Sequence, residues 1–168
     1  YRYQFYLAQS YFDSQQWDKS KEAYQKRVGQ GGWNEEAFYS QFRVALICAI
    51  QKQPEEVIQM EFLKAHNIRP IRAEPLVELS RINRMNGRAG AAYIFAKRAV
   101  EIPFPKNDIL FISEDVYRYV ALDELGATAF YAGKPHEGYA ACKKLLDENR
   151  ITKEHRVRVE TNLSEYKK

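Results

Sequence analysis

The chain has 168 residues, of which 45% are hydrophobic and 29% charged, with only eight glycines and six prolines. This composition excludes a collagen-like or disordered chain and favours a folded helical protein. The formal charge of +4 arises from basic residues interspersed with acidic ones rather than gathered in a stripe, so we expect no nucleic-acid partner. Because no signal peptide or bilayer-length apolar run occurs, we expect a cytoplasmic chain without a membrane span.

The reactive side chains predict neither a metal site nor a cofactor. Cys48 and Cys142 fall at apolar positions of predicted helices, so we expect buried thiols without a disulfide. His66, His136 and His155 are isolated from one another, which is typical of solvated surface histidines. We therefore expect no catalytic residue, metal or cofactor in this chain.

The stretch 2–31 predicts a helical hairpin. Its apolar and small residues follow the tetratricopeptide spacing, with Trp17 opening the second helix. The matching residues are Gln4, Leu7, Ala8, Tyr11, Ser20 and Tyr24. A small residue at position 8 lets the second helix approach closely, and such a hairpin needs a stacked neighbour to bury its other apolar side.

The same pattern recurs along the chain. A large apolar residue followed by a small one occurs at Leu7-Ala8, Val44-Ala45, Leu79-Ser80 and Leu125-Gly126, at separations of 37, 35 and 46 residues. We expect each small residue to be buried, and Gly87 and Gly133 to adopt the left-handed conformation at the turns. The predicted fold is an all-α, tetratricopeptide-like α-α superhelix of four helical hairpins plus a C-terminal capping helix. It forms one domain, with hairpins at about 2–31, 34–67, 72–102 and 115–148.

The second hairpin departs most from the pattern. Asn34 is expected to cap its first helix, with Glu35 and Glu36 as acidic residues of the first turn. In the partner helix an acidic residue stands where an aromatic belongs, so either Met60 or Phe62 must supply that contact.

An insertion at 103–114 lengthens the last repeat interval. Two prolines stop helix formation, and the apolar run 109–112 follows. We expect an ordered loop that covers apolar surface near the third and fourth hairpins. The capping helix is expected at 152–166, with an inner face comprising Val157, Val159 and Leu163.

Residues 2–45 and 72–125, including the insertion Pro103-Phe104-Pro105, resemble the tetratricopeptide-like region that follows the catalytic domain in a group of bacterial family 2 glycosyltransferases. The resemblance covers roughly 2–146. It implies an accessory region, because the chain contains no Asp-x-Asp motif, βαβ pattern or phosphate loop of a nucleotide-sugar domain. The chain begins with tyrosine rather than methionine, so we expect it to be a piece of a longer protein whose other part could hold a transferase.

A concave groove is the candidate binding site, because the first helix of each tetratricopeptide hairpin lines the inner side of the stack. In this register the groove collects Tyr6, Tyr39, Arg43, Glu78, Arg81, Arg84, Asp123, Glu124 and Tyr131. Aromatic faces beside arginines and carboxylates can hold a peptide or a sugar. Alternatively, these charges simply pair with one another on a solvated face.

Three functions remain open. The first is a non-catalytic interaction module, similar to a glycosyltransferase accessory region, that binds a protein, a glycan acceptor or a neighbouring domain. The second is a stand-alone adaptor that binds a peptide segment. The third is an enzyme that uses Glu78, Asp123 or Glu124 as an acid-base pair, which lacks an accompanying nucleophile or metal site.

Overall fold

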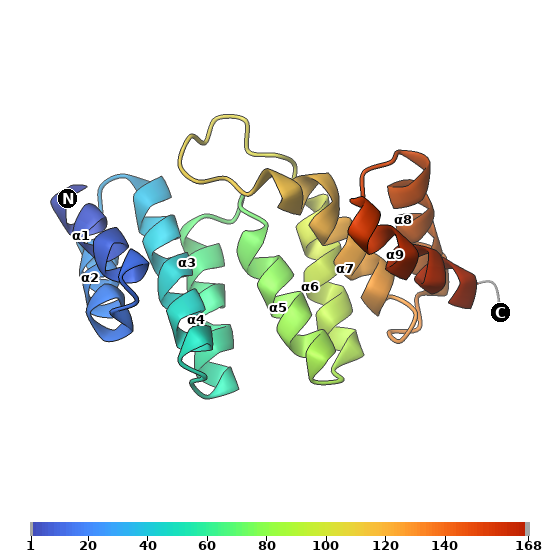
Figure 1. The fold of residues 1–168 in the computed structure, drawn as a ribbon, viewed down its shortest axis with the longest axis horizontal. Helices are drawn as coiled ribbons and strands as arrows, with labels where there is room; N and C mark the ends of the chain where they lie inside the picture. The colour runs from blue at the N-terminus through green and yellow to red at the C-terminus, as the bar shows by residue number, and fades with distance from the viewer. Residues whose placement is uncertain (1, 167–168) are drawn as a thin grey trace. The chain divides into compact units, whose positions relative to one another are not determined.

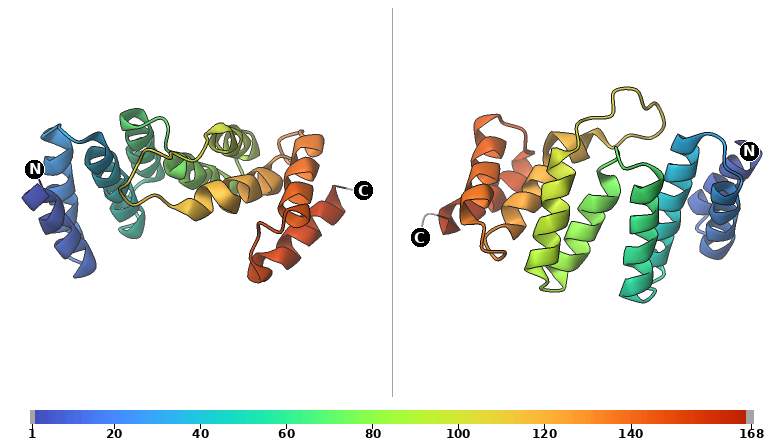
Figure 2. Two further views of the ribbon diagram at one scale, coloured as in Figure 1. Left: turned by 90° about the horizontal axis from the view of Figure 1, so that it is seen from above. Right: turned by 180° about the vertical axis from the view of Figure 1, so that it is seen from behind.

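The computed structural model describes residues 2–166, and over this range the chain is all-α, as the sequence predicted. Consecutive helices form antiparallel hairpins joined by short turns (Figures 1 and 2). The elements are α1 (Arg2–Asp13), α2 (Trp17–Gly29), α3 (Asn34–Ile50), α4 (Glu55–Ile68), α5 (Glu74–Met85), α6 (Ala89–Glu101), the π-helical turn η1 (Val116–Val120), α7 (Ala121–Thr128), α8 (Pro135–Asp147) and α9 (Lys153–Glu165). None of the helices within residues 2–166 has both the length and the apolar character needed to cross a membrane.

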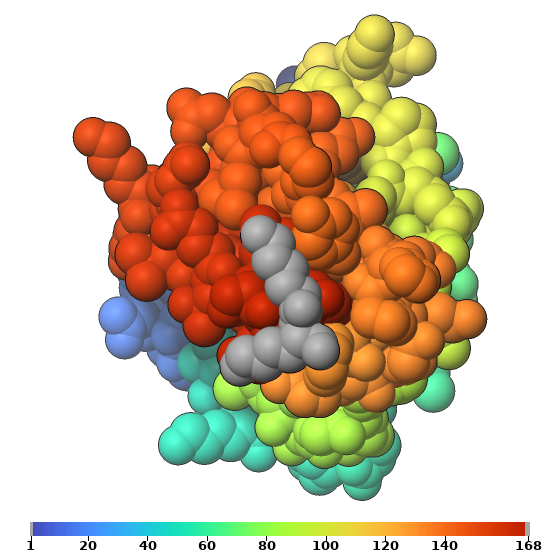
Figure 3. All heavy atoms as spheres, turned by 90° about the vertical axis from the view of Figure 1, so that its right-hand side faces the viewer, coloured from blue at the N-terminus to red at the C-terminus, as the bar shows by residue number. Residues whose placement is uncertain are grey.

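The described residues divide into two compact units, where the sequence predicted one domain. The first unit comprises 2–75 and 106–112, and therefore contains α1 to α4. The second comprises 76–105 and 113–166, and contains most of α5 together with α6 to α9. Figure 3 views the second unit from the side where α8 and α9 lie next to each other.

The small residues bring the helices of each hairpin together, as predicted. Ala8, Ala45, Ser80 and Gly126 are all buried. At two of these contacts a serine hydroxyl crosses the hairpin: Ser20 donates to the carbonyl of Ala8, and Ser80 donates to the carbonyl of Ala92, each at 2.9 Å. A larger side chain at these positions would push the paired helices apart.

The four hairpin turns share one backbone conformation. The residue seven positions after each small residue has a positive φ: Gln15 (57°), Lys52 (53°), Gly87 (72°) and Gly133 (73°). In the second turn the N–H of Lys52 donates to Ala49 and the N–H of Gln53 to Cys48, both at 3.0 Å, which closes a Schellman motif. The prediction for the two glycines is confirmed. The other two turns place a side-chain-bearing residue in a conformation that costs about 1–2 kcal/mol.

The core of the first unit is aromatic. Phe5, Tyr24 and Phe38 are buried together with aliphatic residues of α3. Phe62 is also buried and its ring lies 5.6 Å from that of Phe42, whereas Met60 is exposed. Phe62 therefore supplies the aromatic contact that the repeat pattern left undecided.

The two acidic residues that open α3 bind other parts of the chain instead of completing a capped helix end. Asn34 is the first residue of α3, Trp33 occupies the cap position, and no side chain caps the helix. Glu36 accepts from the buried Arg27 at 2.8 Å. Glu35 accepts backbone N–H groups from residues far along the chain, as described next.

The loop 106–112 packs within the first unit, on the first two hairpins and on Arg72 at the start of the third, whereas the sequence predicted contacts near the third and fourth hairpins. Glu35 Oε2 accepts the N–H groups of Ile109 and Leu110, both at 2.8 Å. Phe111 adopts a φ of +44°, and its ring stacks 4.6 Å from that of Tyr39. Sequence patterning predicted only a local role for Glu35, because the residue stands in the first turn of a helix.

A buried ionic network holds the same loop. The side chain of Asp108 has no exposed area, and it pairs with Arg69 and with Arg72, which is 1% exposed. Arg72 also pairs with Glu74 at 2.7 Å and donates to the carbonyl of Phe111 at 3.0 Å. The guanidinium of Arg72 thus connects the start of α5 to the loop.

Helix α9 covers the apolar side of α8, as predicted for a capping helix. Val159 is fully buried and Leu163 packs beside it, but Val157 is 70% exposed, so its predicted inward position is wrong. Two residues span about 200° of helical rotation, so neighbours at this spacing cannot share one face. The hydroxyl of Tyr166, just after α9, donates to the carbonyl of Gly126 at 2.7 Å and accepts the N–H of Phe130 at 3.0 Å.

Candidate ligand-binding pocket in the second unit

A charged cluster links α5 to α7. Arg84 donates through Nε and Nη2 to the two carboxylate oxygens of Glu124, both at 3.0 Å. Arg81 lies 3.3 Å from Glu78 and 4.0 Å from Glu124. The predicted charged residues of α5 and α7 therefore contact one another. Much of their charge is neutralised by these ion pairs.

Helix α9 adds an arginine that the sequence analysis did not select. Arg158 Nη2 donates to Asp123, whose side chain is largely buried. Asp123 and Glu124 are consecutive residues of α7, so each anchors one arginine from a different neighbouring helix. These carboxylates position the two guanidinium groups and do not line the space between them.

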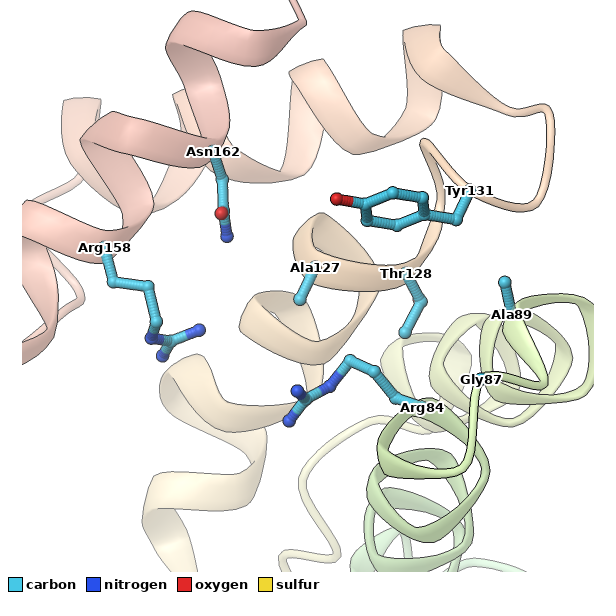
Figure 4. A pocket seen from close by; sticks show the side chains of 8 residues that line it. All are labelled: Arg84, Gly87, Ala89, Ala127, Thr128, Tyr131, Arg158 and Asn162. Atoms are coloured by element: carbon cyan, nitrogen blue, oxygen red, sulfur yellow. The ribbon is translucent and has the colours of Figure 1, made fainter.

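That space is a pocket of about 410 Å³, which we call the arginine pocket. Its lining residues are Arg84, Gly87, Ala89, Ala127, Thr128, Tyr131, Arg158 and Asn162. Figure 4 shows the guanidinium groups of Arg84 and Arg158 pointing toward each other along one side, with the amide of Asn162 and the hydroxyl of Tyr131 facing the same space. A volume in this range suits a small ligand or a few side chains of a larger one.

The remaining wall of the pocket is apolar in character. Ala89 and Ala127 contribute methyl groups, and the Thr128 hydroxyl donates at 2.8 Å to the carbonyl of Glu124 within α7. Tyr131 is 78% exposed and stands at the edge, where its ring offers a flat apolar face. The pocket thus combines charged donors on one side with an apolar surface on the other.

Electrostatics in the cluster follow from burial and from hydrogen bonding. Burial raises the pKa of Glu78, and the nearby charge of Arg81 opposes this shift. The hydrogen bond to Glu124 raises the pKa of Arg84, so this guanidinium keeps its charge at every physiological pH. The pocket therefore presents permanent positive charge whose counter-charges lie behind it on α7.

The predicted groove residues of the first unit form a different arrangement. Tyr39 is buried beneath the ring of Phe111, and burial raises the pKa of its phenol. The guanidinium carbon of Arg43 lies 5.0 Å from the centre of the Tyr39 ring and 4.1 Å from that of Phe12. Tyr6 is exposed. Of the three, only Tyr6 offers an open aromatic face, because the loop 106–112 covers Tyr39.

The sequence analysis did not select the pocket residues Arg158 and Asn162, because it interpreted the last helix only as a polar-backed cap. Their spacing of four residues places them on one face of the helix, and that spacing was the available signal. Within residues 2–166, no group of three or more histidine, cysteine, aspartate or glutamate side chains is arranged to hold a metal ion. Both cysteines are buried as predicted, and burial raises the pKa of Cys142 to about 11.

No family model matches the chain, and no curated protein sequence matches it.

Proposed function

We propose that the chain is a non-catalytic binding module whose ligand occupies the arginine pocket. One observation carries this proposal: donors from α5 and α9 converge on a single pocket, and a largely buried carboxylate fixes each guanidinium from behind. Binding sites gain affinity when their polar groups are held in place before the ligand arrives.

The carboxylates of the cluster support binding better than acid-base chemistry. Asp123 and Glu124 each accept hydrogen bonds from an arginine, so their carboxylate oxygens are already engaged within the protein and do not line the pocket. Glu78 is the remaining candidate acid, and its nearest charged partner is Arg81. A general acid needs a second group matched to its role, and the described residues that line the pocket include no carboxylate, imidazole or thiol.

We further propose, from the sequence resemblance, that this module belongs to the accessory region of a glycosyltransferase. Its arginine pocket would then serve a protein, a glycan acceptor or the attached catalytic domain. The sequence of the parent gene tests this part directly. An upstream domain with an Asp-x-Asp motif supports it, whereas an initiator methionine immediately before Tyr1 supports the alternative of a stand-alone peptide-binding adaptor.

Binding at the pocket is tested by ¹H–¹⁵N NMR titration of the whole chain. Two probes are used: a blocked acidic hexapeptide, acetyl-Ala-Leu-Glu-Glu-Leu-Ala-amide, and chitotetraose as a neutral glycan. The proposal expects one probe to shift the amide signals of Ala127, Tyr131 and Asn162, and the Asn162→Leu variant to abolish these shifts. Absence of pocket shifts with both probes at millimolar concentration contradicts a binding role for the pocket.

A further inference from the structure

We infer that the arginine pocket takes the carboxylate of an acidic peptide segment and seats a neighbouring apolar side chain of that segment. This inference rests on the proposed function and specifies its ligand. Both guanidinium groups face one space, and each retains donors there. The hydrogen bonds within the protein use Nε and Nη2 of Arg84 and Nη2 of Arg158, whereas a guanidinium carries five N–H donors.

Two cations that face each other favour an anion between them. The positive charges of Arg84 and Arg158 repel across the pocket, and their counter-ions Glu124 and Asp123 lie on the α7 side. A ligand carboxylate between the two guanidinium groups would accept from both and reduce this repulsion. The planar fork of arginine matches the geometry of a carboxylate, which makes the contact directional as well as electrostatic.

The apolar wall favours a peptide over a sugar. A bound sugar ring buries several hydroxyl groups, and each needs a partner to avoid a desolvation cost. Gly87, Ala89 and Ala127 form the apolar part of the lining, and the hydroxyl of Thr128 is already used within α7. Besides the two arginines, only the Asn162 amide and the Tyr131 hydroxyl offer polar groups to the pocket among the described residues that line it. An aliphatic side chain fills that wall without leaving polar groups unpaired.

Two isosteric peptides, one with Glu and one with Gln, test whether binding requires the carboxylate. The probe acetyl-Ala-Leu-Glu-Glu-Leu-Ala-amide is compared by isothermal titration with the same peptide carrying Gln in place of both Glu residues. Loss of a charge-assisted hydrogen bond weakens binding by about 10-fold to about 150-fold. We expect the Gln peptide to bind weaker by at least about tenfold, and the affinity of the Glu peptide to fall as salt is raised.

Matched arginine variants locate the effect. Arg158→Ala removes one side of the pocket, whereas Arg156→Ala alters an exposed arginine of the same helix that pairs with Glu160 at 3.0 Å and does not line the pocket. The first variant should weaken the Glu peptide by at least about tenfold and leave the Gln peptide unchanged; the second should leave both affinities unchanged. Since Arg158 also contacts Asp123, circular dichroism checks the fold of the variant, and Arg158→Lys serves as a second variant that keeps the charge but loses the fork.

The outcomes distinguish this inference from the proposed function. Equal affinity for the Glu and Gln peptides at the pocket overturns the carboxylate inference while the binding module stands. Pocket shifts with chitotetraose and not with the Glu peptide also overturn it, in favour of a glycan ligand. Absence of binding at the pocket with every probe contradicts the proposed function itself.

Discussion

Replacing Asp108 with asparagine tests the network that anchors the loop 106–112. The substitution keeps the shape of the side chain but removes the charge that balances Arg69 and Arg72 inside the first unit. Breaking a buried ion pair by removing one partner costs about 3–5 kcal/mol. The Arg69 side chain is 22% exposed and recovers some hydration, so we expect the lower end, about 3 kcal/mol of unfolding free energy.

The protein contains its own reporter for this experiment. Both of its tryptophans, Trp17 and Trp33, lie in the first unit. Urea unfolding followed by tryptophan fluorescence therefore reports that unit, while circular dichroism reports the helices of both. We expect Asp108→Asn to lower the fluorescence midpoint, and Glu22→Gln, which breaks an exposed pair with Lys26 on α2, to leave it unchanged.

Lowering the pH should abolish the difference in unfolding free energy between the wild type and Asp108→Asn. The hydrogen bond from Arg69, opposed by burial and supported by Arg72, holds the pKa of Asp108 below its usual range. A carboxyl whose pKa is depressed by folding contributes its full stability above the unfolded pKa, near 3.9, and loses it as the pH falls through the folded value. The two proteins should differ most at pH 7 and converge well below pH 4. An unfolding free energy of Asp108→Asn at pH 7 within about 0.5 kcal/mol of the wild-type value would refute the role assigned to the network.

Four further substitutions probe the turns, the loop and the capping helix. Lys52→Gly should raise the unfolding free energy of the first unit by about 0.5–1 kcal/mol, measured by fluorescence, because glycine adopts the left-handed conformation without strain. Gly87→Ala should lower the unfolding free energy of the second unit by about 1 kcal/mol, measured by circular dichroism. Changes of the opposite sign would contradict the turn geometry. Phe111→Ala should cost roughly 2 kcal/mol in the fluorescence-detected transition, about half the value for a fully buried ring because the side chain is 53% exposed, whereas no change would mean that the stacking on Tyr39 is not stabilising. Tyr166→Phe should cost about 1 kcal/mol in the second unit alone, through loss of its hydrogen bonds to Gly126 and Phe130, and a shift of the fluorescence midpoint would argue against that location.

The parts of the fold that depend on short sequence intervals could be predicted. The hairpins follow from small residues that recur at regular spacing, and the burial of Ala8 and Ser80 follows from the same register. The glycine turns were predictable because a left-handed backbone favours glycine at that position. Gln15 and Lys52 adopt the same conformation without glycine, and only comparison of the four turns in the structure reveals the shared seven-residue offset.

Contacts between residues far apart in the sequence could not be predicted. Glu35 looked like an ordinary acidic residue at a helix start, yet it binds the backbone of Ile109, 74 positions later. The candidate site shows the same limit. Arg84 and Tyr131 were selected from the repeat register, whereas Arg158 joined them only because α9 folds back beside α7. Periodicity identifies the face of a helix but not the partner that meets it.

The anchoring of the loop 106–112 has a consequence for the order of events on the ribosome. Residues 2–75 leave the exit tunnel before the loop, so they lack Asp108, which pairs with Arg69 and Arg72, and Phe111, which covers Tyr39. Synthesis of the 37 residues from Leu76 to Ile112 takes roughly 2–7 s at about 5–20 residues per second. Throughout that interval the nascent first unit lacks the Asp108 carboxylate of its ion-pair network and keeps an uncovered aromatic surface. Translation speed across α5 and α6 therefore sets how long those groups are open to chaperones before the unit can close.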